Sequence, residues 1–286
     1  MKKFAYLLIV LLFGCHSPQK QTAKMVTVSI LPQKYFVDQI ARDLVEVNVL
    51  VPPGSSPHNY SILPSQMKNL AGSKVWIQIG LLAFEEAWKE KFAEINKNLV
   101  IVNSSEGIQL ISGIEHDDGD SDHHPGGFDP HIWLAPTDVK VISLNTLNAL
   151  KAAFPEFADK FDANFTTFIA GIDSLTNQIN DKLAPLKNRN VLIFHPTLGY
   201  FAQEFHLNQI PLELDGKEPS PKHMKDIVDL ARKENIHVIF IQKEFDTENA
   251  LQLAREIGGE VMTIDPLEYD WEKQILEITN KIAGQQ

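Results

Sequence analysis

The sequence EFADKFDANFTTFIAGIDSLTNQINDKL, residues 156–183, divides the chain into two halves. This segment contains no proline and a single glycine. Its apolar side chains recur at spacings of three and four, the period of an amphipathic helix: Phe157, Phe161, Phe165, Phe168, Ile172, Leu175 and Ile179. At 1.5 Å per residue the helix would be roughly 40 Å long, about the width of a domain. A core helix of a single domain is one interpretation. We favour a rigid strut between two domains, because strands and helices resume directly after it.

Short aliphatic runs alternate with helical patterns on both sides of this segment. The expected strands are residues 25–30, 45–51, 75–79 and 99–102, then 190–194, 209–214, 237–241 and 260–264. The expected helices are residues 33–44, 64–71, 84–95 and 139–153, then 198–205, 221–234, 247–257 and 271–282. This alternation is typical of βαβ units. We therefore predict an α/β fold with two lobes, residues 25–155 and 184–286, each with a mostly parallel sheet flanked by helices, joined by one long backbone helix over residues 156–183.

The first residues have the pattern of an export signal. Lys2 and Lys3 precede an apolar run at residues 4–13, which is shorter than the roughly 20 residues that span a bilayer. Gly14-Cys15 ends a segment that resembles the lipobox of bacterial lipoproteins, and Cys15 is the only cysteine. We expect residues 1–14 to be removed and residues 15–24 to form a tether lipidated at Cys15. The alternative is an ordinary signal peptide with an incidental cysteine. If Cys15 is lipidated, the chain lies in the cell envelope. It is then attached only through its lipid, to a membrane facing the periplasm or the exterior.

The charge of the chain favours cations as ligands. Its 286 residues carry a formal net charge of −11, and removing residues 1–14 takes away two lysines. An acidic protein of this kind is a poor partner for nucleic acid or anionic lipid and attracts cations.

Three histidines lie in comparable settings, each next to a proline in a turn or at a strand end: His58, His131 and His195. A single such histidine is more often structural than a ligand, but three coincidences indicate a metal site. Ligands of open parallel sheets bind beyond the carboxyl ends of the strands, where His58, His195 and Asp265 each follow an expected strand. Imidazole ligands, with a carboxylate as the fourth ligand, suit the tetrahedral coordination of zinc. We therefore predict that His58, His131, His195 and Asp265 bind one divalent metal ion in the cleft between the lobes.

Three further histidines, His116, His123 and His124, share a segment with several aspartates. Such a tract can collect metal ions weakly, and it can equally be a solvated acidic loop. Both interpretations stay open.

Several motifs occur in an order and spacing that resemble a known family: Pro52-Pro53-Gly54, His58-Asn59-Tyr60, Asp129-Pro130-His131-Ile132-Trp133-Leu134, Phe194-His195-Pro196, Gly199-Tyr200-Phe201, Gly216-Lys217-Glu218-Pro219-Ser220 and Ile264-Asp265-Pro266-Leu267. The chain from Met25 onward resembles the zinc/manganese substrate-binding proteins of ABC transporters, with ZnuA-type zinc-uptake lipoproteins among them. The resemblance implies a receptor with a metal in the interlobe cleft, and we expect the protein to be monomeric. The resemblance also implies delivery of that metal to a membrane permease driven by a cytoplasmic ATPase.

The same resemblance bears on the cargo. Manganese members have a glutamate where this chain has His195, so the transported ligand implied is Zn²⁺, with Mn²⁺ or iron as the alternative. The chain departs from many relatives at Ser61-Ile62, where Glu-Pro is common, and at Gln66, where Asp is common. In some zinc members water or another carboxylate replaces the residue that corresponds to Asp265.

Two functions of other classes compete with transport. A zinc hydrolase needs an open coordination position and a general base. The chain has no His-Glu-x-x-His helix, and Glu204 is the one candidate base near His195. An adhesin that uses zinc structurally should unfold when metal is removed, whereas a transport receptor survives without metal. We expect no enzymatic activity. We also expect little hinge closure, because a long helix resists bending. Metal binding should weaken below the imidazole pKa of about 6.5, because protonated imidazole does not bind metal.

Overall fold

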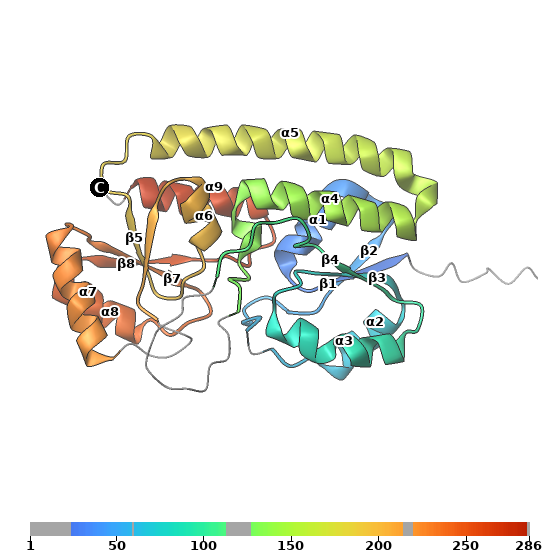
Figure 1. Ribbon diagram of the computed structural model, residues 1–286, viewed down its shortest axis with the longest axis horizontal. Coiled ribbons are helices and arrows are strands. Elements are labelled where there is room, and N and C mark those ends of the chain that lie inside the picture. The colour runs from blue at the N-terminus through green and yellow to red at the C-terminus, as the bar shows by residue number, and fades with distance from the viewer. Residues whose placement is uncertain (1–23, 59, 113–126, 214–219, 285–286) are drawn as a thin grey trace, which may run out of the picture.

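The computed structural model describes residues 24–58, 60–112, 127–213 and 220–284. Two four-stranded sheets lie side by side, and one long helix, α5 (Ala158–Leu183), runs over both of them (Figure 1). The expected export signal, Cys15 and the segment with His116, His123 and His124 lie outside the described residues.

The first sheet is parallel throughout, with strand order β2-β1-β3-β4. Its strands are β1 (Met25–Val28), β2 (Glu46–Val49), β3 (Ser73–Gln78) and β4 (Val100–Asn103). The helices α1 (Leu31–Ala41) and α4 (Pro136–Ala153) lie on the side that faces α5 (Figure 1). The opposite side carries α2 (Pro64–Ala71) and α3 (Ala83–Ile95), and a 3-10 turn, η1 (Arg42–Leu44), continues α1.

The second sheet repeats this plan with strand order β6-β5-β7-β8, again parallel throughout. Its strands are β5 (Asn190–Ile193), β6 (Asn208–Pro211), β7 (Val238–Gln242) and β8 (Glu260–Ile264). The helices α6 (Gly199–Glu204) and α9 (Trp271–Ala283) lie towards α5, and α7 (Pro221–Lys233) and α8 (Glu248–Ile257) lie on the other side (Figure 1). The predicted α/β architecture of two parallel sheets and one long helix is therefore confirmed.

The long helix begins two residues later than its sequence pattern indicated. A 3-10 turn, η3 (Pro155–Phe157), precedes it and reverses the chain after α4. From Ala158 the buried stripe follows the predicted spacing, with Phe161, Phe168, Ile172, Leu175 and Ile179 facing inward. Despite its length α5 is amphipathic, and in the described part of the chain no helix combines the length and the apolar character needed to cross a membrane.

The two halves share one hydrophobic core. A single cluster of buried side chains extends from the first sheet through α4, α5 and α9 to the second sheet, and a smaller cluster lies under α7 and α8. Phe36 of α1 packs edge-on against Trp271 of α9, with ring centroids 5.5 Å apart. The indole of Trp133 donates to the carbonyl of Pro266 (2.9 Å), and that of Trp271 donates to the carbonyl of Trp133 (2.6 Å). Any opening between the halves would expose these buried aromatic rings to water, at a cost of roughly 25 cal/mol per Å².

Candidate metal centre

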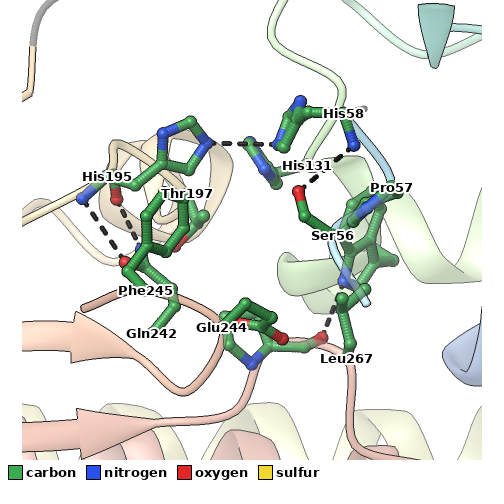
Figure 2. A pocket seen from close by; sticks show the side chains of 12 residues that line it. Ser56, Pro57, His58, His131, His195, Thr197, Gln242, Glu244, Phe245 and Leu267 are labelled. Carbon is green, nitrogen blue, oxygen red and sulfur yellow. Dashed lines mark hydrogen bonds between the residues drawn. The ribbon is translucent and has the colours of Figure 1, made fainter. Parts of the chain in front are cut away.

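Three imidazoles meet between the two sheets (Figure 2). His58 comes from the loop after β2, His195 lies two residues after the end of β5, and His131 precedes a 3-10 turn, η2 (Ile132–Leu134). One ring nitrogen of each lies within 4.8 Å of the other two. The Nε2 atoms of His58 and His195 are 3.2 Å apart. The structure thus brings together the three histidines that the sequence singled out.

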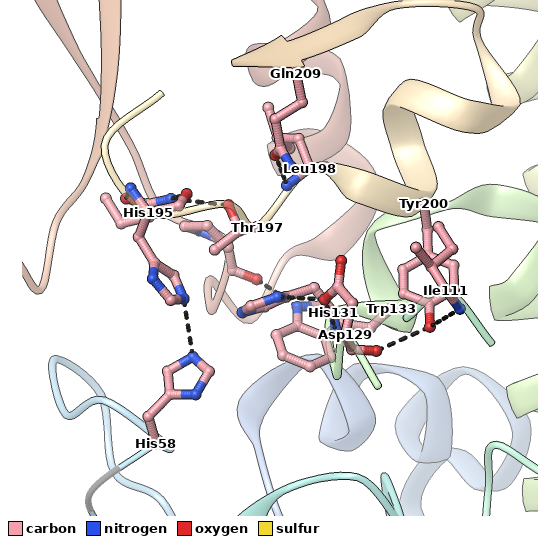
Figure 3. A network of polar contacts seen from close by, with 12 residues as sticks. His58, Ile111, Asp129, His131, Trp133, His195, Thr197, Leu198, Tyr200 and Gln209 are labelled. Carbon is pink, nitrogen blue, oxygen red and sulfur yellow. Dashed lines mark hydrogen bonds and ion pairs between the residues drawn. The ribbon is translucent and has the colours of Figure 1, made fainter. Parts of the chain in front are cut away.

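Carboxylates orient two of the three rings. His131 Nδ1 lies 2.7 Å from Asp129 Oδ1, and His195 Nδ1 lies 2.8 Å from Glu213 Oε2 (Figure 3 shows the first of these pairs). An ionised carboxylate only accepts hydrogen bonds, so each pair fixes the proton on Nδ1. The Nε2 lone pair of each ring is left free, which is the arrangement in which histidine binds a metal.

Buried polar groups hold the backbone that carries these rings. Gln242, at the end of β7, accepts from His195 N (3.4 Å) and donates to His195 O (2.5 Å) and Thr197 Oγ1 (2.9 Å). Asp129 Oδ1 also accepts from His131 N at 2.9 Å, in the turn that leads into η2. The two histidines are therefore placed before any ion arrives.

Asp129 is also held against the second half of the chain. Tyr200 Oη on α6 donates to the carbonyl of Asp129 (2.8 Å) and accepts from Ile111 N (3.1 Å), as Figure 3 shows. A Cβ atom on Gly199 would lie 2.5 Å from Asp129 Oδ2. The absence of a side chain at position 199 is what lets α6 approach this carboxylate.

The imidazoles border a cavity of about 20 Å³, room for roughly one water-sized sphere. The other residues around it are of two kinds, the apolar or aromatic Pro57, Trp133, Phe245, Pro266 and Leu267 and the polar or charged Ser56, Thr197, Gln242 and Glu244. Phe245 stacks on the His195 ring with centroids 5.2 Å apart. A space of this size accommodates a single ion.

The surroundings keep two of the rings unprotonated. Burial of the ring, with neighbouring His131 and His195, lowers the pKa of His58 to about 3, although the residue as a whole keeps solvent exposure. Burial also lowers the pKa of His131, against the opposing effect of Asp129. Both rings are thus free to bind metal at neutral pH. Because their pKa values are lowered, protons compete with the metal for His58 and His131 only at a lower pH than the ordinary imidazole pKa of about 6.5 would give.

Asp265, the fourth predicted ligand, lies outside this group. Its Oδ2 pairs with Lys243 Nζ at 3.2 Å, its Oδ1 accepts from Leu267 N at 3.2 Å, and it does not border the cavity. The pairing of β7 with β8 explains this. Gln242 and Ile264 are register partners, so the residues that follow them, Lys243 and Asp265, end their strands side by side.

Glu204, considered above as a hydrolytic base, is also turned away from the cavity. It accepts from Thr137 N (3.0 Å) and Thr137 Oγ1 (2.8 Å) at the start of α4. It therefore joins α6 to α4 and takes no part in the three-histidine group.

Sequence reasoning missed three side chains around the site: Glu213, Gln242 and Glu244. Each lies at or just after the carboxyl end of β6 or β7. Glu213 and Glu244 follow their strands as His58 and His195 follow theirs, so the same rule could have found both carboxylates. Burial raises the pKa of Glu244, and nearby Asp265 raises it further.

The donor set fits zinc. Imidazole nitrogens are borderline-soft ligands that zinc favours, and three of them with a fourth group make a tetrahedral site. The cavity accommodates one ion, and the Asp129 and Glu213 pairs supply the hydrogen bonds that orient metal-bound histidines.

Comparison with known proteins places the chain in a family. The family model described as ZnuA, zinc-uptake complex component A, periplasmic, matches residues 26–282. A solved structure of a zinc-bound deletion mutant of ZnuA has a TM-score of 0.85 and 36% sequence identity, covering 92% of this chain and 98% of that one. An Mn-bound periplasmic metal-binding protein from Candidatus Liberibacter asiaticus has a TM-score of 0.77 at 22% identity over 91% of this chain and 99% of its own, a likeness of fold alone.

Streptococcal relatives are longer than this chain. The zinc-binding protein AdcA of Streptococcus pyogenes serotype M3 is 26% identical over 96% of this chain and 58% of the relative. The zinc-binding lipoprotein AdcA of Streptococcus pneumoniae strain R6 is 24% identical over 94% of this chain and 56% of the relative. The chain thus spans somewhat more than half the length of these relatives.

Proposed function

Because the chain belongs to the family of periplasmic zinc-uptake complex A components, we propose that it is the metal-binding receptor of an ABC transporter. It captures Zn²⁺ between its two lobes and delivers the ion to a membrane permease, which a cytoplasmic ATPase drives. The observation that carries this proposal is the convergence of His58, His131 and His195 on a cavity of single-ion size.

The third histidine favours zinc over manganese as the cargo. Mn²⁺ prefers carboxylate and carbonyl oxygens, whereas imidazole suits zinc. The Nδ1 atom of His195 pairs with Glu213, so its Nε2 atom on the other side of the ring is left for the metal. The zinc-bound relative is consistent with this choice.

Capture and release need different behaviour from the three ligands. His131 and His195 are fixed by carboxylates, so they stay in place without metal. Within the described residues no ion pair is formed by His58, whose loop lies between β2 and α2 without regular structure. We infer that His58 is the ligand that moves when zinc is delivered.

The N-terminal sequence supports a proposal for the cellular position. Export and lipidation at Cys15 would leave residues 15–24 as a tether. Lobes over residues 25–155 and 184–286, linked by residues 156–183, would then stand beside the permease. The name of the pneumococcal relative, a zinc-binding lipoprotein, supports an anchored form.

A competitive titration tests the function. The metal-stripped protein should bind one Zn²⁺ tightly, Mn²⁺ should fail to displace it, and His131→Ala or His195→Ala should abolish tight binding. His237→Ala, which changes an exposed histidine next to β7, is the matched control and should leave affinity unchanged. Preferential Mn²⁺ binding would keep the receptor and change the cargo, and metal-dependent hydrolysis would indicate an enzyme. Unfolding of the lobes by a chelator would favour the adhesin.

A further inference from the structure

Three histidines leave a tetrahedral zinc site one ligand short. Two carboxylates lie at the nearby edge of the second sheet, each just after a strand of the β7–β8 pair: Glu244 and Asp265. Which of them completes the site depends on what each side chain already contacts.

Asp265 is occupied. Lys243 Nζ holds one of its oxygens, and the amide of Leu267 holds the other. Zinc binding at Asp265 would have to break a pair of opposite charges and turn the carboxylate towards a cavity that it does not border.

Glu244 is placed differently. It borders the same cavity as all three histidines and forms no ion pair within the described part of the chain. Figure 2 shows its side chain on the side of the cavity opposite His58, between Gln242 and Leu267. Glu244 is therefore a carboxylate at the border of the cavity into which the three histidines converge.

The backbone at this point is fixed, so only the side chain has to move. Lys243 N donates to Ile264 O (3.0 Å), and Phe245 N donates to Gln242 O (3.1 Å), which holds both neighbours of Glu244. The carboxylate is not yet within 4.8 Å of all three ring nitrogens. The rotatable bonds of a glutamate side chain allow it to swing towards an arriving ion without a change in the fold.

We propose that Glu244 supplies the fourth, carboxylate ligand of the zinc site, and that Lys243 holds Asp265 out of the coordination sphere. This inference rests on the proposed zinc-binding function. It gives each half of the chain two ligands, His58 and His131 from the first and His195 and Glu244 from the second. It also places one negative charge next to the ion in a cavity whose other lining side chains are uncharged or imidazoles.

The test compares two isosteric changes in the metal-stripped full chain. Glu244→Gln should weaken zinc binding at least about tenfold, the lower end of what loss of a hydrogen-bond partner of a metal ligand costs. Asp265→Asn should leave the affinity within about threefold of the unchanged protein. Melting of each metal-free variant should match the unchanged protein, because Glu244 is only half-buried.

A crystal structure of the zinc complex gives a readout that does not depend on the variants. The proposal expects a Glu244 oxygen about 2.0–2.2 Å from the ion. An Asp265 oxygen or a water in that position, or a Glu244→Gln variant with unchanged affinity, would overturn it. His131→Ala distinguishes failure of the zinc-binding function from failure of the Glu244 assignment. If His131→Ala keeps full zinc affinity, the proposed function fails. If His131→Ala loses binding and Glu244→Gln does not, only the assignment of the fourth ligand is overturned.

Discussion

Replacing Glu213 by glutamine should weaken zinc binding without unfolding the protein. Glu213 is 6% exposed, and its Oε2 lies 2.8 Å from His195 Nδ1. The carboxylate can only accept from Nδ1–H, so it enforces the tautomer that leaves Nε2 free. A glutamine amide can instead donate to Nδ1, which would move the ring proton to Nε2, the atom that must bind zinc.

The expected size of the effect follows from this chemistry. Loss of a carboxylate that orients a metal-bound histidine costs 10- to 100-fold in affinity, or about 1.4–2.7 kcal/mol. The lower value applies if the glutamine oxygen still accepts from Nδ1. The upper value applies if the amide turns over and the tautomer changes. Hydrogen bonds to charged groups contribute about 1.5–3 kcal/mol, which is the same range.

The assay is a competition titration against a chromophoric chelator near pH 7.5, together with melting of the metal-free protein. Glu256→Gln removes an exposed carboxylate from α8 in the same half and should change neither result. If Glu213→Gln binds zinc within about twofold of the unchanged protein and melts at the same temperature, tautomer control through Glu213 is refuted.

Three further changes test other contacts. Gly199→Ala should lower zinc affinity in a titration, because the new Cβ would lie 2.5 Å from Asp129 Oδ2 and displace the carboxylate that orients its histidine. An unchanged affinity would show that this close approach does not matter. Gly171→Ala, in the middle of α5 with its nearest neighbour 3.5 Å away, should leave zinc binding alone and stabilise the helix by about 0.5–1 kcal/mol, seen as a higher melting temperature. A lower melting temperature would contradict it. Burial and neighbouring Glu204 raise the pKa of Asp138 from 3.8 to about 7. Between these values the folded chain keeps a proton that the unfolded chain loses. The stability that this proton contributes is lost as pH rises through about 7. Asp138→Asn should therefore gain melting temperature relative to the unchanged protein between about pH 5 and about pH 8, and a difference that is constant with pH would refute the shift.

The fold could be predicted from the sequence because its signals are local. Each strand is a short aliphatic run, and the α5 stripe repeats every three or four residues, so both appear without knowledge of neighbours. Boundaries were less accurate. Helix α4 begins at Pro136, three residues before the expected start, because proline suits the first position of a helix, where its missing N–H costs nothing.

Some residues of the metal centre could likewise be predicted from local sequence patterns, and others could not. His58 and His195 could be placed because each follows a strand, and the carboxyl ends of parallel strands meet at one edge. The strand order is not written in any local pattern, and it decides the rest. Because β7 lies next to β8, Lys243 stands beside Asp265, and because β6 lies next to β5, Glu213 reaches His195.

The shared core constrains how zinc can leave. A receptor whose lobes were separate could release its ion by hinge opening, but here Trp133 and Trp271 are buried between the halves and hydrogen-bonded across them. Their exposure would cost several kcal/mol, since each aromatic side chain buries about 150–250 Å². In its described residues, the loop between β2 and α2 that carries His58 contains no helix or strand, so its movement does not require these two indoles to be exposed. We therefore expect zinc to be delivered by withdrawal of His58 from the fixed pair of His131 and His195, without opening of the two halves.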